Sequence, residues 1–86
     1  SPAHLAVALH DGGNETPLPV VLAKGEGALA ERMMQAAREA GVPVMQNIPL
    51  ARALTADAEV GQYIPSELVE PVAELLRLLQ QMNQQN

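Results

Sequence analysis

The chain has almost no aromatic side chains with which to fill a core. Tyr63 is its single aromatic residue among 86, and it contains no Trp and no Phe. Apolar residues still make up 48% of the sequence, so we expect a folded domain and not a disordered segment. The core must therefore be assembled from Leu, Val, Ile, Ala and Met. We expect one domain, residues 1–86, with a thin margin of stability.

The charge balance and the missing cysteines exclude several classes of function. Ten acidic residues oppose five basic ones, which gives a formal net charge of −5. A nucleic-acid-binding surface needs clustered basic residues to neutralise phosphates, so we expect no nucleic-acid partner. The absence of cysteine excludes disulfides and thiolate chemistry. No apolar run approaches the roughly 20 residues of a membrane span, so any membrane attachment is expected to lie in another part of a longer protein.

Two short strands joined by a turn are predicted at the start of the chain. Residues 5–9 alternate Leu, Val and Leu with two alanines, which is typical of a strand covered on both faces. Asp-Gly-Gly-Asn at residues 11–14 predicts a turn. Residues 20–23, Val-Val-Leu-Ala, predict a second strand that pairs antiparallel with the first, with Leu22 in the core.

A helix and a third strand are predicted next. Residues 28–40 carry Leu, Met and Ala at helical spacing, and Gly41 is a typical C-terminal stop. Residues 42–45, Val-Pro-Val-Met, predict a third short strand with Val44 in the core. A strand–helix–strand unit of this length is a right-handed crossover, so the third strand is expected to lie parallel to the second.

Two further helices complete the predicted order ββαβαα, a small mixed sheet flanked by helices. The second helix is expected from Pro49 or Leu50 to about Glu59, with proline in the permitted first turn. The last helix is expected to be capped by Ser66. Its polar tail, residues 80–86, is read as a solvated helix end that frays.

The polar residues form no recognisable catalytic or metal-binding cluster. His4 and His10 lie six residues apart on one predicted strand, or about 20 Å, which is too far for both to bind one ion. Residues 24–27, Lys-Gly-Glu-Gly, precede a helix but lack the glycine-lysine element of a phosphate-binding loop. We therefore predict no metal, no cofactor and no catalytic residue in this chain. The residues alone favour a binding module over an enzyme.

Several segments, taken in order, resemble the FlhB/YscU family. Residues 2–9 resemble the strand that begins in the family's Asn-Pro-Thr-His motif, and residues 21–25 resemble its next strand and turn. The most specific segments are Gly-Val-Pro-Val at residues 41–44, Ile-Pro-Leu-Ala-Arg-Ala-Leu at 48–54 and Val-Gly-Gln-Tyr-Ile-Pro at 60–65. The resemblance covers essentially the whole chain.

The resemblance implies a place in a type III secretion export apparatus. The chain would be the larger, C-terminal part of a soluble domain on the cytoplasmic face of the bacterial inner membrane. In the family this domain cleaves itself once between Asn and Pro, the pieces stay associated, and export switches to later substrates. The implied partners are the upstream cleavage fragment, other export-gate subunits, a length-control protein and secreted substrates. Residues 46–49, 62–65 and 75–77 are closer to virulence-type members, which favours an injectisome over a flagellar apparatus.

The same resemblance places the cleavage site immediately before Pro2, in the loop of Pro2, Ala3 and His4. An Asn side-chain amide attacks its own backbone carbonyl, closes a succinimide and expels the proline nitrogen, so no metal or cofactor is required. In this sequence Ser1 stands where the family has Asn, and Ala3 where it has Thr. Either Ser1 is foreign to a fragment that begins at Pro2, or it replaces Asn. In both cases we expect a product half that cannot cleave itself.

In the family's domain, cleavage lies in a loop between two strands. We therefore expect a strand of the missing upstream piece to pair beside the first strand of this chain and to complete the sheet. Without that strand, the chain would expose an open sheet edge.

Two basic residues are predicted to contact a partner. Lys24 follows the second strand, and Arg52 lies in the Pro-Leu-Ala-Arg stretch of the second helix. If both lie at the same edge of the sheet, they form a positive spot suited to an acidic element of an export partner. For Lys24 and Arg52, the alternative that both only solubilise the surface stays open. For the whole chain, two alternatives stay open: an unrelated small α/β ligand- or protein-binding module, or a small hydrolase.

Overall fold

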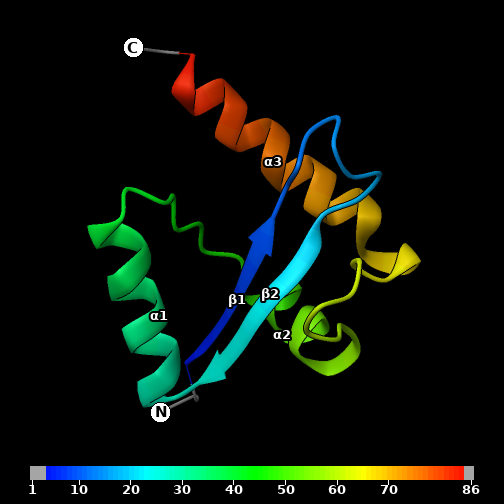
Figure 1. Cartoon of the computed structure of the whole chain (residues 1–86). Helices are drawn as coiled ribbons and strands as arrows, with labels where there is room; N and C mark the ends of the chain where they lie inside the picture. Colours follow the sequence, from blue (N-terminus) through cyan, green and yellow to red (C-terminus); the bar gives the residue numbers. More distant parts are fainter. Residues whose placement is uncertain (1–3, 85–86) are drawn as a thin grey trace.

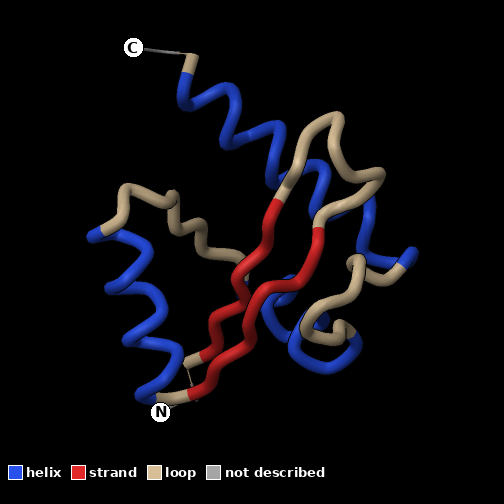
Figure 2. Tube along the Cα trace, viewed as in Figure 1, coloured by secondary structure: helices blue, strands red, loops and turns tan. Residues whose placement is uncertain are grey.

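The computed structural model describes residues 4–84 and shows a two-stranded sheet flanked by helices (Figure 1). The elements are β1 (Leu5–His10), β2 (Val20–Glu26), α1 (Ala28–Glu39), α2 (Ile48–Asp57), the 3-10 turn η1 (Ser66–Leu68) and α3 (Val69–Asn83). The two strands are antiparallel neighbours, as predicted, and a turn-rich loop joins them (Figure 2). The predicted α/β class, a small sheet with helices around it, is confirmed.

A β-bulge in this hairpin changes which side chains reach the core. Ala8 pairs with Ala23, but Leu9 pairs with Val21, so Leu22 is left over as the extra residue of the bulge. Val21 is fully buried, whereas Leu22 is 56% exposed. The prediction that Leu22 serves the core is therefore wrong, because the bulge interrupts the simple alternation on which it rested.

Adjacent residues of β2 show that α1 and α2 cover opposite faces of the sheet. The Lys24 side chain reaches the backbone carbonyls of Thr55 and Ala58 at the end of α2. A Cβ atom placed on Gly25 would instead lie 2.5 Å from the sulfur of Met33 in α1. Since neighbouring strand residues point to opposite faces, the sheet is a layer between α1 on one side and α2 on the other.

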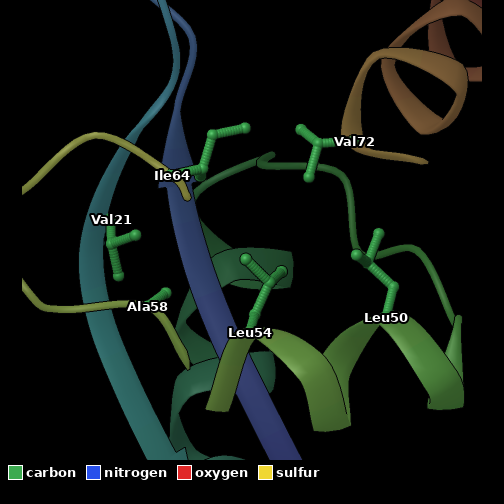
Figure 3. Close-up of a cluster of buried hydrophobic side chains, with 6 residues drawn as sticks. All are labelled: Val21, Leu50, Leu54, Ala58, Ile64 and Val72. Carbon is green, nitrogen blue, oxygen red and sulfur yellow. The ribbon is translucent and has the colours of Figure 1, made fainter. Parts of the chain in front are cut away.

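The hydrophobic core lies on the α2 side of the sheet (Figure 3). Its buried members come from β2, α2, α3 and the segments between the helices, and they are Val21, Leu50, Leu54, Ala58, Ile64 and Val72. Val7 and Leu9 of β1 pack against this cluster from the sheet. On the other face Ala30 of α1 is fully buried, but Leu29 is 46% exposed, so the predicted apolar stripe of α1 is only partly covered.

The predicted third strand is absent from the described residues. Residues 42–47 have no regular secondary structure and pair with no strand. Val42 is 53% exposed and Val44 is 37% exposed, so the core position predicted for Val44 is wrong. A strand requires a neighbour for its hydrogen bonds, and within residues 4–84 β1 pairs with β2 alone. The parallel crossover and the mixed pairing of the sheet are therefore not formed by this part of the chain.

The ends of α1 and α2 follow recognisable signals. Gly41 follows α1 with a φ of 75°, a conformation that glycine adopts easily, and this confirms the predicted stop. α2 begins at Ile48, slightly earlier than predicted, because the Asn47 side chain accepts a hydrogen bond from the Leu50 N–H at 3.1 Å. The helix ends at Asp57.

The last helix starts differently from the prediction. Ser66 opens the 3-10 turn, and its hydroxyl donates to the Glu67 carboxylate at 2.6 Å, so the predicted cap is wrong. Pro71 falls in the first turn of α3, where its missing N–H costs least. The helix continues to Asn83, so the polar tail begins as a solvated helix end. Its fraying stays a prediction, and residues 85–86 lie outside the described part.

Candidate functional site

The predicted cleavage loop meets the described structure at His4. Pro2 and Ala3 lie outside the described residues, so the structure bears on His4 alone. The His4 carbonyl accepts a hydrogen bond from the Gly27 N–H at 2.9 Å. Its ring Nδ1 lies 2.6 Å from Oε1 of Glu31, in the first turn of α1. Backbone and side chain of His4 are therefore both attached to the segment that leads from β2 into α1.

Lys24, predicted to contact a partner, is attached to the C-terminal end of α2. Its ammonium nitrogen lies 2.7 Å from the Ala58 carbonyl oxygen and 3.2 Å from that of Thr55. A cation at a helix C-terminus satisfies carbonyls that have no partner within the helix and interacts favourably with the helix dipole. The structure thus gives Lys24 a role within the fold, and its contact with an acidic partner stays a prediction.

Arg52 is exposed on α2, the helix that Lys24 holds. Leu50 and Leu54 of the same helix are buried, so the core fixes the rotation of α2 about its axis. Arg52 precedes Thr55 by three residues, which places the two positions as neighbours on the helix surface. The structure therefore brings Lys24 and Arg52 to the same helix, one partly buried and one open to solvent.

The sequence interpretation missed two residues that organise this region. Glu31 carries no motif that singles it out, but the antiparallel hairpin brings the start of β1 beside the end of β2 and hence beside the first turn of α1. Gly25 was interpreted only as part of a turn, although it is buried in β2 where α1 approaches most closely. The signal for both was the short connection from β2 to α1.

Other polar residues considered in the sequence lie on the surface of α3 and at the ends of β1. A hollow beside α3 is lined in part by Glu74 and Arg77, which form an exposed ion pair at 2.5 Å, at a spacing of three residues that suits such pairs on a helix. His4 precedes β1 and His10 ends it. Within residues 4–84, no three His, Cys, Asp or Glu side chains gather in a way that could hold a metal ion.

None of the helices within residues 4–84 combines the length and the apolar character that a membrane span requires.

The sequence matches a protein-family model over nearly its full length. The model is that of the FlhB HrpN YscU SpaS family, and the match covers residues 1–79. The chain is 46% identical over 83 residues to Yop proteins translocation protein U of Yersinia pestis, covering 96% of the chain and 23% of that protein. It is 43% identical over 82 residues to flagellar biosynthetic protein FlhB of Escherichia coli K12, covering 95% of the chain and 22% of that protein. The chain thus spans about a quarter of the length of these relatives.

Solved structures agree with the sequence match. The crystal structure of the PscU C-terminal domain superimposes with a TM-score of 0.88 at 50% identity, covering 91% of this chain and 99% of that one. A mutated EscU C-terminal domain gives a TM-score of 0.83 at 40% identity, covering 90% and 93%. These matches remove the alternative of an unrelated α/β module. The chain belongs to the FlhB HrpN YscU SpaS family of export components, as the resemblance of its motifs implied.

Proposed function

We propose that this chain is the C-terminal part of the export-switch domain of a type III secretion protein. One observation carries the proposal: nearly the whole PscU C-terminal domain is covered by this chain at 50% identity. The longer protein would sit in the bacterial inner membrane and present this domain on the cytoplasmic side. There it would control which class of substrate the apparatus exports, and it would act as a docking module and not as a turnover enzyme.

The switch depends on one self-cleavage between Asn and Pro2. The reaction needs an Asn amide held close to its own backbone carbonyl, and a tight turn supplies that proximity. Ser1 has no side-chain amide, so cleavage before Pro2 by this route requires Asn at position 1 of the longer protein. The attachment of His4 to Gly27 and Glu31 supports a defined loop geometry at this end of the sheet.

The upstream cleavage fragment is the first partner, through a strand that joins the sheet. The two edges of the sheet differ in the described residues. The outer edge of β2 is covered at its start, because Val21 exchanges backbone hydrogen bonds with Gln62 and Gly61 at 2.9 and 2.7 Å. β1 has no second neighbour within residues 4–84, and an unpaired edge is a template for a further strand. A strand from the upstream piece would complete the sheet there.

The exposed side of α2 is the proposed surface for export partners. Arg52 is one of five basic residues in a chain of net charge −5, so it suits an acidic element of an export-gate subunit, a length-control protein or a secreted substrate. Lys24 would contribute to the same positive surface, although its ammonium already binds two carbonyls. We favour an injectisome over a flagellar apparatus on the motif details of residues 46–49 and 62–65.

Self-cleavage is tested on the longer protein with its upstream segment. With Asn at position 1, a fragment that begins at Pro2 is expected in the mass spectrum; with Ser1 retained, the chain should stay intact. Cleavage with Ser1 in place would point to another nucleophile and contradict the Asn mechanism. Absence of cleavage with Asn in place would contradict self-processing altogether.

The docking surface is tested by Arg52→Glu in the same protein. We expect lower secretion of late substrates with unchanged cleavage and melting temperature, because exposed charges act on association more than on folding. Arg38→Glu, an exposed reversal on α1, is the matched control and should secrete normally. Normal secretion by the folded and cleaved Arg52→Glu protein would exclude this surface.

A further inference from the structure

Four apolar side chains gather at the start of β2, where two segments far apart in the sequence run side by side. Tyr63 lies directly opposite Val20 in an antiparallel bridge, and residues paired in this way keep their side chains on one face. Leu22 follows this pair in one segment, and Val60 precedes it in the other. Tyr63, Leu22 and Val60 are 48%, 56% and 55% exposed. We call these four residues the β2 patch.

The backbone holds the β2 patch in place. The Gly61 N–H donates to the Val21 carbonyl at 2.7 Å, which joins the two segments. Val21 and Ile64 belong to the buried core cluster (Figure 3). Because successive side chains of an extended segment point to opposite sides, their neighbours Val20 and Tyr63 face away from the core. The patch is therefore ordered before any partner binds, which lowers the entropy lost on binding.

Tyr63 is also the single aromatic residue of a chain that has no Trp and no Phe. It lies at the surface, while the core is built from aliphatic side chains. Tyrosine is enriched in protein–protein interfaces and among the residues that dominate their affinity, because it offers a large contact area with few torsion angles to fix. Together with its three apolar neighbours it is typical of an interaction site and not of scattered surface side chains.

The charges around the β2 patch indicate the chemistry of the partner. The segments that build it, residues 18–22 and 59–64, contain Glu59 and no Lys or Arg. Asp11 directly follows the β1 residue that pairs with the start of β2. The ammonium of Lys24, further along β2, is bound to carbonyls at the end of α2. The border of the patch is therefore acidic, which favours basic partners and disfavours an anionic membrane surface.

We propose that the β2 patch docks a protein segment whose apolar side chains are flanked by Lys or Arg. Tyr63 and Leu22 are the apolar anchors, and Glu59 attracts the basic flank. The patch is a second docking surface, separate from the exposed side of α2, and it takes partners of the opposite charge. The inference rests on the proposed function for its role in export, whereas the binding is tested without it.

The binding test uses this chain and a short amphipathic peptide built of Leu and Lys, with a peptide of Leu and Glu in the same pattern as the matched probe. Calorimetry measures the affinity, and amide NMR maps the contact. We expect the Leu–Lys peptide to shift the amides of residues 19–23 and 60–64, and the Leu–Glu peptide to bind at least about tenfold more weakly. Failure of the Leu–Lys peptide to bind, equal affinity of the two peptides, or shifts confined to α3 would overturn the inference.

Variants of exposed residues identify the anchors. We expect Tyr63→Ser and Leu22→Ser each to weaken binding of the Leu–Lys peptide about tenfold, and Glu59→Lys about threefold. Met82→Ser, 57% exposed near the end of α3, and Glu39→Lys, exposed on α1, are the matched controls and should bind as the parent does. Parent affinity in both serine variants of the patch would overturn the inference. Tyr63-dependent binding of the chain to phosphatidylglycerol vesicles would assign the patch to a membrane and overturn it equally.

Secretion by the longer protein separates this inference from the proposed function. Tyr63→Ser should lower secretion with unchanged melting temperature, and Met82→Ser should secrete normally. Normal secretion by the folded Tyr63→Ser protein would exclude a role of the patch in export and leave the proposed function intact. A parent that binds the Leu–Lys peptide at the patch but supports no export would instead contradict the proposed function, and the docking surface would stand.

Discussion

The helices α1 and α2 cover opposite faces of the same two strands, but they are held there by different means. α2 inserts Leu50 and Leu54 into a core that also receives Val21 and Val72. α1 approaches through small residues, with Ala30 fully buried against the strands. A chain without Phe or Trp can thus build one well-filled face from aliphatic side chains, while its other face relies on close backbone approach.

The two faces of the sheet are therefore expected to contribute unequally to the stability of the domain. The α2 face contains the buried cluster, and the side chain of Lys24 reaches the end of that helix. The α1 face instead carries Glu31 beside His4, next to the predicted cleavage site. We therefore expect substitutions in the buried cluster on the α2 face to change the free energy of unfolding most.

The largest expected effect breaks the better-packed face. Leu54→Ala removes a side chain that is 4% exposed and should lower the free energy of unfolding by about 3 kcal/mol, because it leaves a cavity in the core. Leu29→Ala on α1, where the side chain is 46% exposed, should cost below about 1 kcal/mol. Urea denaturation measures both, and equal losses would contradict the contrast between the faces.

Close approach on the α1 face is tested by Gly25→Ala. The added methyl group would lie 2.5 Å from the Met33 sulfur and 3.0 Å from Leu29 Cγ, so we expect a loss of about 1–2 kcal/mol from overpacking. Shortening the neighbour in the double variant Gly25→Ala, Met33→Ala should couple favourably with the first change in a double-mutant cycle. Additive losses in that cycle would mean that Gly25 matters for another reason.

A smaller effect distinguishes Arg52 of α2 from Lys24 of β2, whose side chain reaches the end of α2. Lys24→Met keeps an apolar stem but removes the donor to Ala58 and Thr55, and it should cost about 1.5 kcal/mol of unfolding free energy. Arg52→Met removes an exposed charge and should change stability by less than about 0.5 kcal/mol. If thermal unfolding shows equal shifts for the two variants, Lys24 does not hold the end of α2 as described.

The smallest effect concerns the other end of the same helix. Asn47→Ala removes the side-chain oxygen that accepts the Leu50 N–H and should cost about 1 kcal/mol. Gln46→Ala, one residue earlier and exposed, serves as the control and should be close to neutral. Equal midpoints of urea denaturation for these two variants would contradict the capping role.

Local sequence signals predicted most helices and strands, but they failed where the structure depends on pairing between segments that are far apart in the sequence. The hairpin, the stop at Gly41 and the inward side chains of α2 follow from periodicity and turn chemistry. Residues 42–45 have strand-like sequence but pair with no strand within the described chain, because pairing depends on a neighbour that periodicity cannot supply. The bulge at Leu22 was equally invisible, since it is defined by register against β1.

Only the parts of the candidate site that lie within one local motif could be predicted from the sequence. Arg52 lies exposed on α2, as its place in the helix suggested. The attachment of Lys24 to α2 spans 34 residues of sequence, and that of His4 to Glu31 joins two separate elements. Such contacts arise from the packing of the hairpin between its helices, and no local pattern encodes them.

We expect the sheet of this chain to be completed by a strand from the upstream segment of the longer protein, as proposed above. Hydrogen–deuterium exchange of the chain with and without that segment tests this claim most directly. The unpaired edge of β1 should gain hydrogen bonds, so we expect slower exchange in β1, little change in α2, and a higher melting temperature. Unchanged exchange in β1 together with an unchanged melting temperature would contradict the claim.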